Sequence, residues 1–221
     1  MRPVQRGAEP SGAKTYEAMR PTLVARLGCY CSYCELPVSH VPHAEHIVPK
    51  DRFPAWRDRW DNLLVSCTWC NSYKGDERPP PEKVDEYLWP TRDNTARAFS
   101  YASIIPRVSD MLEEPLRSRA ARLRGLVRLA VTGDTRGKAR AEAYNLAKRY
   151  ASKLSSAKDP ELLRESIVDI AVATGFFSVW MEVFSGDLVI RRGLIASFVG
   201  TARDCFEPAT TAPVMRPGGC L

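Results

Sequence analysis

Histidine is scarce in this sequence: three occur in 221 residues, and all three lie within HVPHAEHIVPK, residues 40–50. Long apolar runs are missing too. The longest nearly charge-free stretch, Ile170–Met181, falls well short of the roughly 20 residues that a membrane-spanning helix needs. Residues 1–15 contain no apolar run that resembles a signal peptide. We therefore expect a cytoplasmic protein with no membrane partner.

The seven cysteines do not predict a set of disulfides. Their number is odd, and cytoplasmic thiols are kept reduced. With 44% hydrophobic and 26% charged residues, the composition is that of a globular protein. The cysteines are therefore better explained by metal binding or by packing.

Positive charge is concentrated in the second half of the chain. Residues 1–90 are neutral, so the net charge of +6 arises entirely beyond them. Between Pro115 and Lys153 there are 11 basic residues against two acidic ones. This concentration favours contact with a polyanion such as nucleic acid, and the alternative is a solvated helix face that also binds a partner.

Proline and periodicity divide the chain into three predicted segments. Residues 1–28 form an N-terminal extension, expected to be frayed up to residue 15, with a short helix over Thr15–Leu27 that Gly28 ends. Residues 29–90 form a compact, loop-rich core, and the prolines of RPPPEKVDEYLWP mark its end. Residues 91–221 form a helical domain, with helices expected over 116–133, 139–154, 160–175, 176–184 and 189–198.

Two Cys-x-x-Cys pairs frame the histidine segment, Cys31 with Cys34 and Cys67 with Cys70. Two residues between ligands allow a tight turn to aim both sulfurs at one ion, and two such turns complete a tetrahedron around Zn²⁺. The alternatives are buried cysteines that pair by chance or a redox motif. Cys29 competes with Cys31 but lacks the two-residue gap. The two remaining cysteines are expected to be packing residues or free thiols: Cys205 and Cys220.

The segment between the cysteine pairs, together with the residues directly after it, holds the groups that phosphodiester hydrolysis requires. Glu45 offers an oxygen ligand beside the imidazole of His46, and neighbours on an extended backbone project to opposite sides. Asn71 directly follows Cys70 at the start of a predicted helix, and Lys74 is three residues further on the same face.

These residues resemble the HNH, or ββα-metal, nucleases, through EHIVP, NLLVSC and CTWCNSYKGD. The resemblance implies that His46 is the general base and that Asn62 braces the loop that orients it. It implies that Glu45 and Asn71 hold a catalytic Mg²⁺ or Mn²⁺ and that Lys74 contacts substrate phosphate. It also implies a structural Zn²⁺ on the four cysteines and an α+β fold: a small zinc-stabilised ββα-metal core followed by a mainly α-helical C-terminal region.

The chain departs from the family pattern at two positions and carries two extra histidines. Glu45 stands where Asp is common, and Asn71 stands where the family name calls for His. His40 and His43 match no signature position, and we interpret them as loop or substrate-contact residues rather than ligands.

The sequence in and around this core further resembles the HNH nuclease subunits of Septu and retron anti-phage systems. This resemblance rests on YCSYCE, AEHIVPKDRF, RWDNLLVSCTWCNSYKGD and GFFSVWMEVF. It implies an antiviral endonuclease that acts on nucleic acid, with DNA favoured over RNA, beside an ABC-type ATPase partner. The alternatives are a catalytically inactive, zinc-organised module that binds nucleic acid and a structural adaptor.

Overall fold

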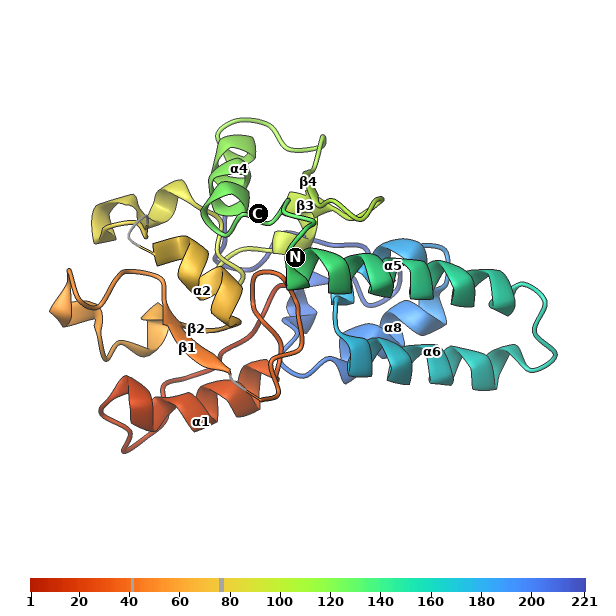
Figure 1. Cartoon of the computed structure of the whole chain (residues 1–221), viewed down its shortest axis with the longest axis horizontal. Coiled ribbons are helices and arrows are strands. Elements are labelled where there is room, and N and C mark those ends of the chain that lie inside the picture. The colour runs from red at the N-terminus through yellow and green to blue at the C-terminus, as the bar shows by residue number, and fades with distance from the viewer. Residues whose placement is uncertain (41, 76–77) are drawn as a thin grey trace.

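The computed structural model describes residues 1–40, 42–75 and 78–221 (Figure 1). Asp76, the last residue of CNSYKGD, lies outside them. Short 3₁₀ turns lie at Pro54–Trp56, Trp60–Asn62, Pro81–Glu86 and Arg203–Cys205. The helices and strands, in chain order, are α1 Tyr16–Leu27, β1 His43–His46, β2 Leu63–Ser66, α2 Thr68–Lys74, α3 Thr95–Ala98, β3 Phe99–Ser100, β4 Arg107–Val108, α4 Leu116–Leu126, α5 Thr135–Leu154, α6 Pro160–Thr174, α7 Phe177–Val183 and α8 Leu188–Ser197.

A two-stranded hairpin between two helices forms the first half of the protein. Strands β1 and β2 are antiparallel, with His46 opposite Leu63 and His43 opposite Ser66. All four residues of β2 are buried, and α1 packs against this strand. Helix α2 packs against β1. Figure 1 shows α1 and α2 on opposite sides of the hairpin. The hairpin is thus held from both faces, which fixes the direction of the side chains on β1.

Helix boundaries follow the capping signals in the sequence. Thr15 caps α1 by accepting from the Ala18 amide, and Gly28 ends the helix with a φ of 78°. Asp159 caps α6 in the same way through the Leu162 amide, and Gly175 ends it with a φ of 77°. A Cβ on Gly175 would come within 2.7 Å of the Glu35 carbonyl oxygen, so glycine is required there.

Four helices, α5 to α8, form the C-terminal region. Helix α6 packs against α5 and α8, and α7 packs against α5 (Figure 1). Their apolar faces enclose a second core, which includes Ala147, Ile167, Trp180 and Leu194. The predicted class, α+β with a helical C-terminal region, is confirmed.

The first core cluster continues across the predicted segment boundary at residue 90. It joins Leu63 of β2 and Trp89 to Leu123 of α4 and Phe176 before α7. The division into 1–28, 29–90 and 91–221 stays a prediction. Within the described residues, no helix is both long and apolar enough to cross a bilayer.

The expectation of a frayed N-terminal stretch is wrong for its first four residues. Met1 and Val4 are fully buried, and Arg2 is 2% exposed. The Arg2 guanidinium donates to the carbonyls of Leu27 at 2.8 Å and Val199 at 2.5 Å. The first residues are therefore held between α1 and the end of α8, a contact that composition does not reveal.

Helix α4 ends earlier than predicted, at Leu126 rather than near Gly133. Arg128 adopts a left-handed conformation with a φ of 45°, which α-helix geometry does not permit. The released carbonyls of Val127 and Arg128 accept from the guanidinium of Arg136, at 2.8 and 3.1 Å. A side chain on α5 thus completes the end of α4.

Candidate active site and metal centre

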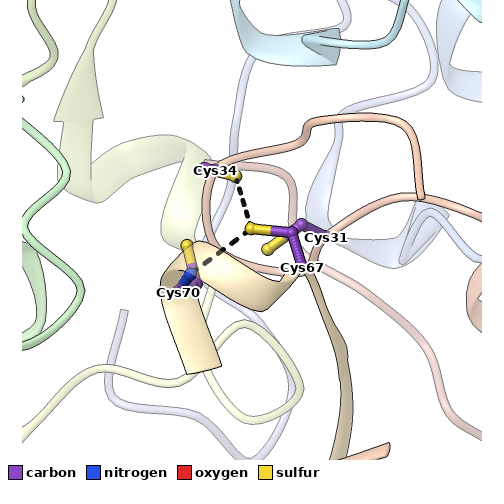
Figure 2. A group of neighbouring side chains, drawn as sticks. All are labelled: Cys31, Cys34, Cys67 and Cys70. Atoms are coloured by element: carbon purple, nitrogen blue, oxygen red, sulfur yellow. Dashed lines mark hydrogen bonds between the residues drawn. The ribbon is translucent and has the colours of Figure 1, made fainter. Parts of the chain in front are cut away.

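The four predicted zinc ligands converge on one point, as Figure 2 shows. Cys31 and Cys34 come from the loop before β1, Cys67 caps α2 and Cys70 lies in its first turn. All four sulfurs lie within 4.8 Å of one another and are buried. The sulfurs of Cys34 and Cys67 are 3.7 Å apart, close to the edge of about 3.8 Å that a tetrahedron with 2.3 Å zinc–sulfur bonds would have. The cluster therefore fits a structural Zn²⁺.

Hydrogen bonds within the cluster favour a thiolate at Cys31. Burial raises the pKa of Cys31, but hydrogen bonds from Cys34, Cys67 and Cys70 outweigh it, so that this pKa lies well below its usual value. Burial raises the pKa of Cys70. A bound metal ion would supply the positive charge that stabilises thiolates in such a buried position.

Arg136 belongs to this centre and was missed by the sequence reasoning. Its guanidinium donates to the Cys70 sulfur at 3.0 Å and pairs with Asp134 at 2.8 Å. It was counted among the basic residues between Pro115 and Lys153, yet it and Arg140 are each only 1% exposed. Neither therefore lies on a surface that could bind a polyanion, and polyanion contact by the exposed members of that set stays a prediction.

His46 is anchored through one ring nitrogen at the end of β1. Its Nε2 lies 2.9 Å from the Arg57 carbonyl oxygen, which can only accept, so Nε2 carries the proton. The lone pair is then on Nδ1. The ring of Tyr16 packs edge-on at 4.8 Å. Burial lowers the pKa of His46, so the ring is neutral at neutral pH.

Asn62 holds the loop between itself and His46 in place through three hydrogen bonds. Its amide donates to the carbonyls of Val48 and Trp56 at 3.1 and 2.8 Å, and its Oδ1 accepts from the Val48 amide at 2.8 Å. This loop includes Arg57, whose carbonyl holds His46. The structure thus places Asn62 where a bracing residue should lie, while its catalytic importance stays a prediction.

Glu45 projects to the side opposite His46, into the protein. Its Oε1 lies 2.5 Å from the Lys74 ammonium, and its Oε2 accepts from the Tyr33 hydroxyl at 2.6 Å. Lys74 also donates to the Tyr33 hydroxyl at 3.0 Å, and the Glu45 and Lys74 side chains are both fully buried. Burial lowers the pKa of Lys74 and raises that of Tyr33 well above its usual value.

The predicted phosphate contact by Lys74 does not fit this placement, because its ammonium faces Glu45 and has no exposed surface. Tyr33, which hydrogen-bonds to both Glu45 and Lys74, was not predicted as a site residue from the sequence. Its position between the two cysteines of Cys-Ser-Tyr-Cys was the available signal.

A cavity of about 320 Å³ contains the predicted base and one predicted metal ligand. Its lining comes from α1, β1, the loop after β1, the helix α2 and the segment after it: Tyr16, Glu17, Arg20, His43, Ala44, His46, Lys50, Asn71 and Arg78. A larger hollow of about 910 Å³ lies elsewhere, around Arg6, Arg92 and Arg216, and contains none of the predicted site residues.

The guanidinium of Arg78 is a cation that the side-chain oxygens of Glu45 and Asn71 share. Its NH2 donates to Asn71 Oδ1 at 2.6 Å, and its Nε lies 3.7 Å from Glu45 Oε1. A carboxylate and an amide oxygen are ligands that suit Mg²⁺ or Mn²⁺. With Arg78 as a stand-in cation between them, the two residues fit a hard divalent ion.

The two other histidines differ in their surroundings. His40 is exposed in the loop before β1. His43 lines the cavity, and its Nε2 lies 3.1 Å from the Thr68 hydroxyl. Of these two histidines, His43 is thus the one at the cavity, and a substrate contact by it stays a prediction.

Comparison with known proteins finds two partial similarities. Residues 31–77 match the family described as HNH endonuclease. The "Septu protein PtuB" of Bacillus thuringiensis is 35% identical over 74 residues, which cover 32% of this chain and 29% of that relative. The aligned region thus spans less than a third of the relative's length, and no solved structure matches the chain. The matched residues 31–77 include the cysteine cluster, the hairpin and α2, so this part of the chain is similar to HNH endonucleases.

Proposed function

We propose that this chain is a metal-dependent HNH endonuclease that hydrolyses phosphodiester bonds of nucleic acid, with DNA favoured over RNA. The observation that carries the proposal is the shared cavity of His46 and Asn71, with the cations of Arg20, Lys50 and Arg78 around it. A base, an oxygen ligand and positive charge are the groups that cleavage of a phosphodiester requires.

His46 is the general base in this mechanism. Because its Nε2 is held by the Arg57 carbonyl, Nδ1 is the atom that takes the proton from the attacking water. The lowered pKa keeps the ring unprotonated at neutral pH, as a base must be. Asn62 is a positioning residue, since it fixes the loop that bears the Arg57 carbonyl.

The reaction forms one bond to phosphorus and breaks another. The water oxygen attacks while the bond to the 3′ oxygen breaks, and the departing oxygen takes a proton from solvent. Products therefore carry 5′-phosphate and 3′-hydroxyl ends. Mg²⁺ or Mn²⁺, held by Glu45 and Asn71, would supply positive charge to the phosphate and the departing oxygen.

Substrate phosphates are contacted by the rim of the cavity rather than by Lys74. Arg20 is exposed, and Lys50 donates to the Tyr16 hydroxyl at 2.5 Å while lying over its ring. Lys74 instead positions Glu45, as its three buried contacts to Glu45, Tyr33 and the His46 carbonyl support.

The likeness to a Septu protein supports a role in anti-phage defence. An ABC-type ATPase partner is a further part of the proposal. Co-expression with the product of an adjacent ATPase gene tests this part of the proposal. A stable complex on size-exclusion chromatography is the expected result, and two separate peaks would contradict it.

A second candidate is a catalytically inactive module that binds nucleic acid or acts as an adaptor. It is favoured by the engagement of both Glu45 oxygens with protein donors. Incubating the zinc-loaded protein with plasmid DNA or with RNA, with and without added Mn²⁺, separates the two. Cleavage that requires Mn²⁺ supports the nuclease, and intact DNA and RNA at every Mn²⁺ concentration would leave the binding module.

A further inference from the structure

Arg78 occupies the place between the two proposed metal ligands. We infer that this guanidinium holds the cation position until a divalent ion replaces it, and that the released Arg78 then binds a substrate phosphate. The inference rests on the proposed function and adds a coupling between metal binding and substrate binding, carried by one residue.

The contacts of Arg78 are those of an exchangeable occupant. Its NH2 donates to Asn71 Oδ1 at 2.6 Å, while Nε lies 3.7 Å from Glu45 and has no hydrogen-bond partner although it is buried. Its side chain is 15% exposed, whereas Lys74, the other cation on Glu45, is fully buried. Arg78 is thus the less firmly held of the two cations and the one with access to solvent.

Charge balance requires Arg78 to leave when a divalent ion arrives. Glu45 carries one negative charge and already faces two cations, Lys74 and Arg78. A divalent ion added to this set would be repelled by both, and repulsion at a few ångströms in a partly buried site is strong. Since Arg78 uses the same oxygens that the ion would use, its departure frees both the ligands and the space.

The released guanidinium remains in the cavity that His46 and Lys50 line. Arginine binds phosphate in a bidentate geometry that is stronger than a single neutral hydrogen bond. A phosphate that draws Arg78 away from Asn71 therefore raises metal affinity, and by linkage the metal raises substrate affinity by the same factor.

Mn²⁺ binding to the zinc-loaded protein tests the exchange without reference to activity. Free Mn²⁺ is measured by electron paramagnetic resonance, with His46→Ala as the common background so that DNA is not consumed. Arg78→Ala should raise Mn²⁺ affinity roughly 10- to 100-fold, the worth of one hydrogen bond to a charged group. Arg78→Gln removes the charge but retains an amide donor, so it should raise affinity as well.

Arg20→Ala is the matched control, because it removes one positive charge from the same cavity without touching Glu45 or Asn71. Its effect on Mn²⁺ affinity should stay within about threefold, since salt screens exposed charges. Adding a DNA oligonucleotide should tighten Mn²⁺ binding to the His46→Ala protein that retains Arg78. It should not do so when Arg78→Ala is added to that protein.

Each outcome decides between the two proposals. If the protein that retains Arg78 binds Mn²⁺ with the same affinity as Arg78→Ala and Arg78→Gln, the exchange is overturned, while the metal site is left intact. Weaker binding in both variants would overturn it too, since Arg78 would then support the ion. No Mn²⁺ binding by any of these proteins would overturn the proposed metal-dependent function, and the exchange with it.

Discussion

Breaking the buried ion pair between Lys74 and Glu45 on one side should cost more stability than removing any exposed charge on this protein. Lys74→Met removes the ammonium and leaves a buried carboxylate whose remaining donor is the Tyr33 hydroxyl, with Arg78 at 3.7 Å. Breaking a buried pair on one side costs about 3–5 kcal/mol. Because Arg78 can approach Glu45, we expect a loss near the lower end, about 3 kcal/mol.

Thermal unfolding at a fixed zinc concentration measures this loss. For a chain of this size, each kcal/mol lowers Tm by roughly 2–4 °C, so Lys74→Met should lower Tm by roughly 6–12 °C. Adding Glu45→Gln to Lys74→Met removes the orphaned charge and keeps an oxygen that accepts from Tyr33. The double variant should therefore recover most of the loss, to within about 1 kcal/mol of the parent.

Lys83→Met is the control, because it makes the same chemical change at an exposed lysine. It should alter the free energy of unfolding by no more than about 0.5 kcal/mol. The reasoning is refuted if Lys74→Met unfolds at the same Tm as the parent. It is also refuted if the double variant is no more stable than Lys74→Met alone.

Three further predictions follow from the metal centre and the basic surface. Elemental analysis of the parent should give about one zinc ion per chain. Cys67→Ser should lose this zinc and misfold, because zinc binding supplies folding energy in such sites. A folded, zinc-free protein would contradict this prediction. Arg136→Met should lower zinc affinity roughly 10- to 100-fold in a competition with a chelating dye, as loss of a group hydrogen-bonded to a ligand does, whereas the exposed Lys138→Met should not. Charge reversal at the exposed Lys138, Lys148 and Arg149 should weaken nucleic acid binding and flatten its salt dependence by about one unit per lost contact; an unchanged slope would assign this face to a protein partner.

Local signals in the sequence carried the prediction of most elements. Caps and glycines bound α1 and α6, and the Cys-x-x-Cys spacing predicted a cluster that the structure brings together. These features depend on residues a few positions apart, so a pattern along the chain is enough to find them.

Contacts between distant residues were not predictable in this way. Arg136 reaches Cys70 across 66 positions, and nothing near Arg136 distinguishes it from the exposed basic residues around it. Lys74 shares a helix face with Asn71 in the sequence pattern, yet α2 packs that lysine onto the inner side of β1. Burial of Met1 and Arg2 likewise depends on where the chain returns after α8.

The central claim, that His46 is the base of a nuclease, is tested most directly by single-turnover cleavage of one DNA substrate in saturating Mn²⁺. His46→Ala should cleave roughly 10²- to 10⁴-fold more slowly than the parent, the usual worth of a positioned base, with zinc content and Tm retained. His40→Ala, which changes an exposed histidine outside the cavity, should cleave at the parent's rate. Cleavage by His46→Ala at the parent's rate would contradict the claim.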